Sequence, residues 1–148
     1  MRRIPALSVR PFDPGPRSRW HWALAYLWVA PTSLVGLVAG VLTLATGGRV
    51  QVERGALEFY GGFSRWMART CRFGAMTLGH VIVGDSAEVL AICRDHEQAH
   101  VRQAERWGPL FIPAYLTASL WVSLRGRHCY FDNPFEIAAR RACGESQA

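Results

Sequence analysis

Two histidines one helical turn apart are the residues of this chain whose types and spacing point most directly to chemistry. They are His96 and His100, and Glu97 lies between them in the string HEQAH. Side chains at positions i and i+4 of a helix have Cβ atoms ~5–6 Å apart, so both imidazoles can reach one Zn²⁺ ion. Glu97 is turned about 100° around the helix from His96, which keeps it out of the ligand set. It can instead take a proton from a water molecule at the metal, so the pattern predicts two zinc ligands and a general base.

A helix from Asp85 to Gly108 is expected to carry these residues. Asp85 as the cap and Glu88 three residues later form a capping-box arrangement, and Gly108 followed by Pro109 ends the helix. One face is predicted to be apolar apart from the two histidines; its residues are Val89, Cys93, His96, His100, Ala104 and Trp107. The alternative interpretation is a pair of core histidines with satisfied hydrogen bonds beside a surface glutamate.

With this motif the chain resembles the HExxH zinc metallopeptidases. The metzincin subgroup would have glycine at 103 and histidine at 106, where this chain has Gln103 and Arg106. The gluzincin pattern remains, and it implies a third zinc ligand from a glutamate on a later helix. A longer stretch, from HEQAHVRQAERWGPLF to DNPFE, is similar to a group of small bacterial membrane proteins with no established substrate. That similarity covers roughly residues 75–141.

Glu136, in the string DNPFE, is the glutamate that this resemblance implies as the third ligand. Asn133 as a cap and Pro134 at the first helical position begin a helix there, and Glu136 projects from its first turn. A glutamate at this place also closes a capping box, which is the structural alternative. His128 and Asp132 are the competing third ligands, since catalytic zinc has three protein ligands.

One departure from the thermolysin-like pattern concerns the partner of a ligating histidine. Arg140 stands where that pattern has an aspartate, so the residue that would orient the histidine is unassigned. Tyr115 and Tyr130 are candidates to polarise a substrate carbonyl, although an aromatic residue in an apolar segment more often serves packing.

Strands are expected before the zinc-binding helix. Alternating residues on both sides of Arg54-Gly55 predict a hairpin over 49–60. The stretch 75–83 is interpreted as a single strand with Met76, Leu78, His80 and Ile82 on one face, and His80 is expected to pack over the site rather than bind metal. In gluzincin-like folds such a strand lines the cleft and pairs with extended peptide.

An uncharged segment at 23–46 predicts where the protein resides. It exceeds the ~20 apolar residues that a helix needs to cross the hydrocarbon core. Five arginines precede residue 20, whereas only Arg49 and Arg54 follow soon after the segment, and cytoplasmic flanks carry the arginine excess. The sequence thus predicts a basic cytoplasmic segment at 1–22, a transmembrane anchor at 23–46 and an extracytoplasmic catalytic part at 47–148, in a bacterial inner membrane.

A second uncharged run spans 107–124. Its 18 residues are borderline for a crossing, and Pro109 and Pro113 leave only about 12 residues of uninterrupted helix. A crossing here would also place His96 and Glu136 on opposite sides of the bilayer. We therefore expect one crossing only, with 107–124 packed against the anchor or lying in the membrane interface.

Composition excludes several classes of protein. The chain has 148 residues, half of them hydrophobic, which is enough for one modest core. Its four cysteines include no CxxC pair, so a structural zinc knuckle is not expected. The net charge is +6, but the arginines gather beside the apolar segment and no recognised module is present, so nucleic acid is not an expected partner.

These observations together predict an α+β protein with a minimal zincin-like domain behind a membrane anchor. The predicted function is that of a zinc-dependent hydrolase, a metallopeptidase, with His96, His100 and Glu136 as zinc ligands. Expected partners are the lipid bilayer and a peptide or membrane-proximal protein substrate. The alternative is a non-catalytic membrane protein that uses a zincin-derived fold as a scaffold or partner-binding module. Oligomeric state and cysteine pairing stay open.

Overall fold

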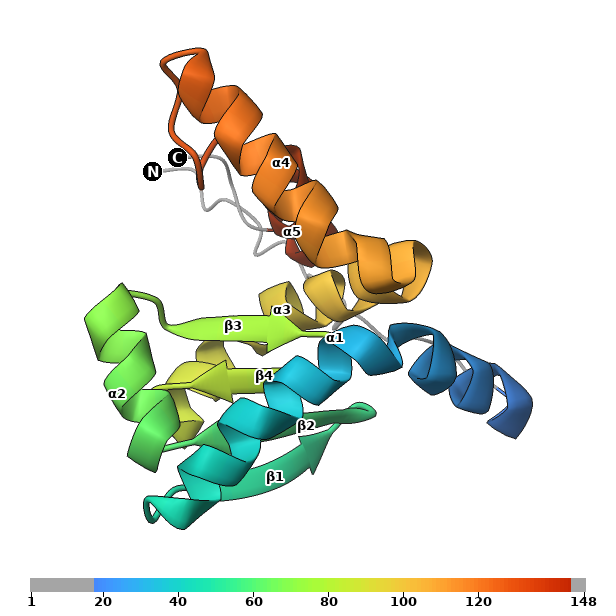
Figure 1. The fold of residues 1–148 in the computed structure, drawn as a ribbon, viewed down its shortest axis with the longest axis vertical. Coiled ribbons are helices and arrows are strands. Elements are labelled where there is room, and N and C mark those ends of the chain that lie inside the picture. Colours follow the sequence, from blue (N-terminus) through green and yellow to red (C-terminus); the bar gives the residue numbers. More distant parts are fainter. Residues whose placement is uncertain (1–17, 145–148) are drawn as a thin grey trace, which may run out of the picture.

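A computed structural model describes residues 18–144 of the chain. In these residues a four-stranded sheet is covered by helices on both faces (Figure 1). The elements are α1 Arg19–Ala45, β1 Arg49–Glu53, β2 Ala56–Tyr60, α2 Gly62–Cys71, β3 Ala75–Leu78, β4 Val81–Gly84, α3 Ala87–Trp107, the short 3-10 helix η1 Gly108–Leu110, α4 Phe111–Leu124 and α5 Pro134–Cys143. The predicted α+β class is confirmed.

The sheet has the strand order β1-β2-β4-β3 and is mixed. β2 and β4 are parallel, while the two outer pairings are antiparallel. Alternation along the strands separates two faces. Val81, Val83 and Phe59 form a cluster on the side of α1 and α2, whereas Ile82 packs with Leu90 of α3. Within residues 18–144, β3 lies at the edge of the sheet, with β4 as its single neighbour.

Both strand predictions have an outcome in the structure. The hairpin over 49–60 is confirmed, with Arg54 and Gly55 at positive φ (49° and 82°) in its two-residue turn. The single strand predicted over 75–83 is wrong, because the chain reverses at Gly79-His80 and Leu78 pairs with Val81. Gly79 has a φ of +70°, a conformation that glycine adopts without steric cost. The apolar run continues through this turn, so it looked like one strand.

The long helix α1 lies closely on one face of the sheet. Its buried residues are spaced by three or four positions: Val29, Thr32, Gly36, Gly40 and Thr43. A Cβ atom at Gly36 would lie 2.6 Å from Cβ of Val81, which shows how near the backbone of α1 comes to β4. The opposite face exposes large apolar side chains, Leu27, Leu34 and Val38 among them.

This helix is also long and apolar enough to cross a membrane. It coincides with the predicted anchor at 23–46. Because one of its faces packs on the sheet, α1 is also one layer of the fold that builds the site. Most of the predicted segment 1–22 lies outside the described residues.

Adding a methyl group at Gly40 is expected to destabilise the fold. A Cβ atom there would lie 2.5 Å from the ring of Phe59, and overpacking of this kind costs about 1–3 kcal/mol. In an isolated helix the same Gly40→Ala change would instead add roughly 1 kcal/mol of stability. We expect a lower Tm in detergent for Gly40→Ala and little change for Val38→Ala on the exposed face. An unchanged or raised Tm for Gly40→Ala would show that α1 does not pack on the sheet.

Helix α3 covers the other face of the sheet and ends at Gly108, as predicted. Its cap is Ser86 rather than Asp85: the Ser86 hydroxyl accepts a hydrogen bond from the Val89 amide, and Asp85 instead pairs with Arg69 of α2. The predicted apolar face is correct for the two histidines, but Trp107 is 43% exposed. Burial extends around the middle of α3 to Glu97 and Gln98, because α3 contacts α5 as well as the sheet.

The last two helices follow the predicted breaks. α4 begins after Pro109 and carries Pro113 in its first turn. Asn133 caps α5 by accepting from the Phe135 amide, and its Nδ2 donates to Ser119 Oγ of α4 at 2.7 Å. This buried asparagine therefore ties the start of α5 to α4. Of the four cysteines, whose pairing the sequence left open, the exposed Cys71 and Cys129 are free thiols.

Candidate metal centre

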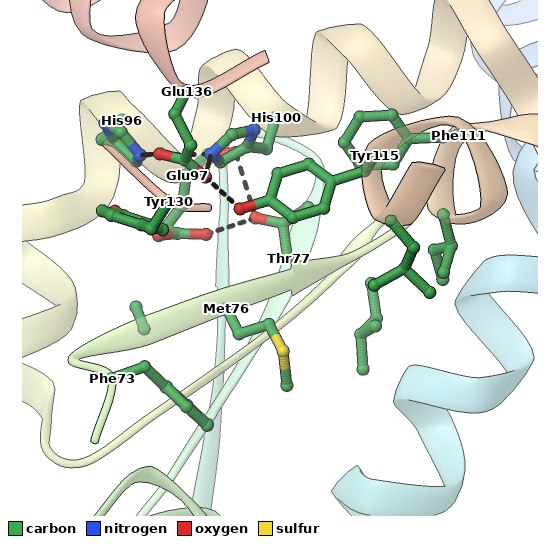
Figure 2. Close-up of a pocket in the computed structure, with 14 residues that line it drawn as sticks. Phe73, Met76, Thr77, His96, Glu97, His100, Phe111, Tyr115, Tyr130 and Glu136 are labelled. Carbon is green, nitrogen blue, oxygen red and sulfur yellow. Dashed lines mark hydrogen bonds and ion pairs between the residues drawn. The ribbon is translucent and has the colours of Figure 1, made fainter. Parts of the chain in front are cut away.

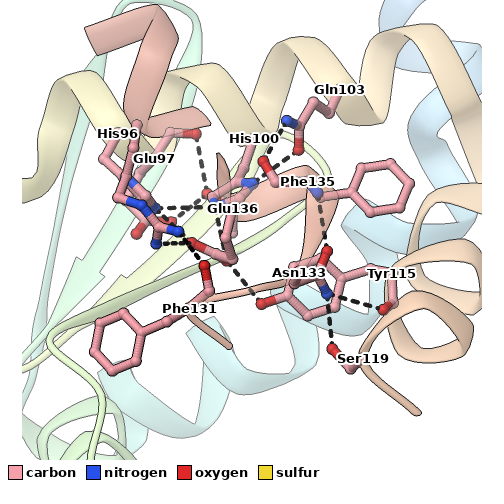
Figure 3. A network of polar contacts seen from close by, with 12 residues as sticks. His96, Glu97, His100, Gln103, Tyr115, Ser119, Phe131, Asn133, Phe135 and Glu136 are labelled. Carbon is pink, nitrogen blue, oxygen red and sulfur yellow. Dashed lines mark hydrogen bonds and ion pairs between the residues drawn. The ribbon is translucent and has the colours of Figure 1, made fainter. Parts of the chain in front are cut away.

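Three side chains from two helices, here called the triangle, bring their ligand atoms close together. His96 Nε2 lies 3.1 Å from His100 Nε2 and 3.1 Å from Glu136 Oε2, and His100 Nε2 lies 3.2 Å from Glu136 Oε1 (Figures 2 and 3). A tetrahedral zinc ion with bonds of ~2.0–2.1 Å would have neighbouring ligand atoms ~3.3 Å apart. All three side chains are buried, and they form a group that could hold a metal ion.

Glu136 was expected either to join the metal ligands or to close a capping box, and its position distinguishes between these two interpretations. Its carboxylate contacts the histidines and accepts a hydrogen bond from the Tyr115 hydroxyl at 2.7 Å. The capping box does not form, because the amide of Asn133 donates to the Tyr130 carbonyl instead. Glu136 is only 2% exposed, and it faces α3 because the Asn133 cap orients the first turn of α5.

The competing third ligands lie elsewhere. Asp132 accepts from the amide of His128 and pairs with Arg127, and His128 Nδ1 accepts from backbone amides in the same loop. His80, in the β3–β4 turn, contacts Glu105 through Nε2 at 3.2 Å. Neither His128 nor Asp132 belongs to the group of His96, His100 and Glu136. The expected packing of His80 over the site is not found, because His80 does not line the adjoining cavity and contacts Tyr26 as well as Glu105.

Gln103 is the orienting residue that sequence reasoning left unassigned. Its Oε1 lies 2.9 Å from His100 Nδ1, and its Nε2 donates to the Phe135 carbonyl at 2.8 Å (Figure 3). The amide is thereby fixed with its oxygen toward His100, so Nδ1 carries the proton and Nε2 keeps its lone pair for a metal. The position of Gln103 three residues after His100 is the signal in the sequence that could have indicated this role. Arg140 binds the Phe131 carbonyl and lies 4.0 Å from Glu136 Oε2.

Loss of this amide is expected to weaken metal binding. For Gln103→Leu we expect the Kd for Zn²⁺ to rise by about 10–100-fold, as for other residues that orient a ligating histidine. Gln98→Leu is the matched control, because it removes a buried amide from the same helix that binds the Glu53 carbonyl rather than a histidine. Competition with a chromophoric chelator measures both constants. Equal affinities in the two variants would contradict the orienting role of Gln103.

Glu97 lies beside the triangle and outside it, as the helical geometry requires. Its Oε2 accepts a hydrogen bond from Thr77 Oγ1 of β3 at 2.6 Å (Figure 2). Burial raises the pKa of Glu97, while His100 and the hydrogen bond from Thr77 act in the opposite direction. A carboxylate with a raised pKa is a better proton acceptor near neutral pH. Thr77 is a second residue of the candidate site that the sequence did not single out, since a threonine in a short strand carries no signal of its own.

The protonation states of the triangle suit a cation. Burial alone would raise the pKa of Glu136, but hydrogen bonds from His100 and His96 outweigh it and hold this pKa well below its usual range. Burial alone would lower the pKa of His100, but its hydrogen bond with Glu136 and the charges of Glu97 and Glu136 together raise it. A carboxylate that stays ionised in a buried place needs a positive partner, which protons on the histidines or a metal ion would supply.

A cavity of about 280 Å³ adjoins these groups. Its polar end holds His96, Glu97, His100 and Glu136, with Tyr130 beside them (Figure 2). The walls are apolar and come from two sides: Phe73, Met76 and Leu78 from β3 and the turn before it, and Phe111, Ile112 and Leu116 from α4. The arrangement can hold a metal ion at the end of an apolar cavity, with one buried carboxylate beside it as a proton acceptor.

No protein-family model, curated protein or solved structure matches this chain.

Proposed function

We propose that the protein is a membrane-bound zinc-dependent hydrolase, a metallopeptidase of the gluzincin type with a minimal zincin-like fold. The observation that carries the proposal is the buried triangle of His96, His100 and Glu136 with Glu97 beside it. Two imidazoles and one carboxylate, with a cavity on the open side, are the ligand set of a catalytic rather than a structural zinc site. Zinc bound there would activate a water molecule and polarise the substrate carbonyl.

The side chains around the triangle have separate roles in this proposal. Glu97 takes the proton from the attacking water and returns it to the leaving amine. Thr77 holds the Glu97 carboxylate in place through its 2.6 Å hydrogen bond. Tyr115 and Gln103 fix Glu136 and His100 by the hydrogen bonds described above.

The proposal favours a peptide substrate because of the place of β3. This strand lines the cavity and pairs with β4 on one side only. Its other edge offers backbone donors and acceptors to an extended chain, which is how peptides add to a sheet edge. An ester or amide without a peptide backbone would leave this edge unused.

Attachment to a membrane through α1 is part of the proposal. The arginine excess before residue 20 favours a cytoplasmic N-terminus. Only one face of α1 is available to lipid, because the other packs on the sheet. The catalytic unit therefore stays close to the bilayer, which suits a membrane-proximal substrate.

A metal-exchange assay tests the proposed activity. The purified full chain in liposomes is stripped with a chelator, divided, and one half is reloaded with Zn²⁺. Both halves are incubated with a diverse peptide library, and the products are identified by mass spectrometry. We expect products from the reloaded protein that are missing from the stripped protein. A folded protein with one bound zinc that releases no peptide product would overturn the peptidase assignment.

A further inference from the structure

The helix α4 is apolar on all sides and yet largely exposed. It contains no charged residue, and within it only Phe111 and Val122 are buried. Leu116 and Leu120 are each 60% exposed, and Trp121 and Leu124 are exposed as well. A helix of this composition is stable only inside a core or a membrane, and an apolar patch of this extent marks an interaction surface. Something apolar must therefore cover α4.

The exposed surface of α4 meets that of α1. Val29 of α1 packs in one cluster with Phe111 and Ile112. The neighbouring Trp28 lies against η1, where a Cβ atom at Gly108 would be 2.2 Å from its ring. Trp28 and Leu110 of η1 are both exposed at this junction, where α1 contacts η1.

The residues that follow α4 indicate what covers it. Arg125 and Arg127 come directly after the helix and are exposed, and the Arg125 guanidinium lies 4.1 Å from the ring of Trp121. Arginine and tryptophan at the end of an apolar segment are typical of the membrane interface, where the positive charges meet lipid phosphates. At 14 residues the helix is ~21 Å long, too short to cross ~30 Å of hydrocarbon. It is therefore suited to enter one leaflet.

The same helix is a wall of the cavity at the metal centre. Phe111, Ile112, Tyr115 and Leu116 line the cavity, and Leu116 is also exposed on the outside of α4. The apolar walls of the cavity thus continue onto the exposed surface of α4. At the Leu116 end, no ring of charged residues surrounds the cavity among the side chains that line it.

We infer that α4 is embedded in one leaflet of the bilayer and that the cavity opens toward hydrocarbon. Its substrate is a membrane-embedded peptide segment with a large apolar side chain next to the reacting bond. That side chain would occupy the space between Met76 of β3 and Ile112 of α4, while its backbone lies along β3. The embedding of α4 stands on its own, and the substrate class rests on the function proposed above.

Spin-label accessibility in liposomes tests the embedding. The full chain is reconstituted in vesicles of phosphatidylcholine and phosphatidylglycerol, with a nitroxide at position 116 or 120 and the exposed Cys71 and Cys129 replaced by serine. The control label is at Ile92, which is 82% exposed but lies on α3, on the face of the sheet opposite α1. We expect labels at 116 and 120 to collide more with oxygen than with a water-soluble nickel complex, and the label at 92 to show the reverse. Aqueous accessibility at all three positions would overturn the embedding.

Alkyl hydroxamates of increasing chain length test the substrate class without an activity assay. Their head group binds a metal with an open position, and their tail probes the cavity by calorimetry on the zinc-loaded protein. We expect the Kd to fall by up to about fourfold per added methylene until the cavity is filled, and the fall to be smaller in Leu116→Ser. Binding that is independent of chain length would overturn the apolar substrate class. A zinc-loaded protein that binds no hydroxamate would instead overturn the proposed function, while the spin-label result would stand.

Discussion

Replacing His96 or Glu136 with alanine is expected to remove stoichiometric zinc from the purified protein. Each residue supplies one side chain of the triangle, in which neighbouring side chains approach to 3.1–3.2 Å, and two protein ligands do not complete a catalytic zinc site. The loss of affinity should exceed the ~10–100-fold expected for Gln103, which only orients a ligand. Metal content after dialysis, measured by mass spectrometry beside circular dichroism for the fold, gives the result.

Two further variants act as controls for this experiment. His128→Ala and Asp132→Ala remove the side chains that compete for the third position and that pair within their own loop. Both should keep one zinc per chain. Zinc retained by Glu136→Ala and lost from one of these variants would assign the third ligand to the loop. A folded wild type that takes up no zinc even after resupply would overturn the metal centre.

Replacing Glu97 with glutamine is expected to lower kcat by about 10²–10⁴-fold, the contribution of a general base. The change preserves the shape of the side chain, and the amide oxygen still accepts the hydrogen bond from Thr77. The charge that accepts a proton is lost, while the three metal ligands are unchanged. Zinc content should therefore equal that of the wild type. Turnover of a peptide identified in the library assay provides the measurement.

Glu105→Gln is the matched control for Glu97→Gln. Glu105 lies on the same helix and is also largely enclosed, but its partners are His80 and Arg102, which do not line the cavity. The activity of the Glu105→Gln variant should stay near that of the wild type. If Glu97→Gln keeps both its zinc and the biological phenotype of the wild type, the protein is a scaffold with a zincin-derived fold and not an enzyme.

Local patterns in the sequence were sufficient for the elements that carry the site. The i, i+4 spacing of the two histidines, the stop at Gly108 and the Asn133-Pro134 start of α5 all depend on residues within one or two turns of each other. Such short-range signals reflect backbone geometry and capping, which do not require knowledge of the rest of the fold. For the same reason the Arg54-Gly55 hairpin was predicted correctly.

Errors at the local level arose where several patterns fit the same residues. The apolar run over 75–83 is compatible with one strand or with two strands around a glycine, and only the pairing of β4 with both β2 and β3 selects the second. Asp85 and Ser86 are both good caps, and in the folded chain Ser86 takes the role while Asp85 pairs with Arg69 of α2.

Tertiary structure alone decided which side chains meet at the candidate metal centre. The sequence could not choose between Glu136 as ligand and as cap, because that choice depends on α5 packing against α3 and α4 through Asn133. Thr77 and Gln103 acquire their roles from contacts with residues 20 and 32 positions away in the chain. Composition predicted that α1 is apolar, whereas its packing on the sheet depends on the close approach that Gly36 and Gly40 permit. Periodicity determines which face a residue occupies, and the partner on that face is determined only when distant segments fold together.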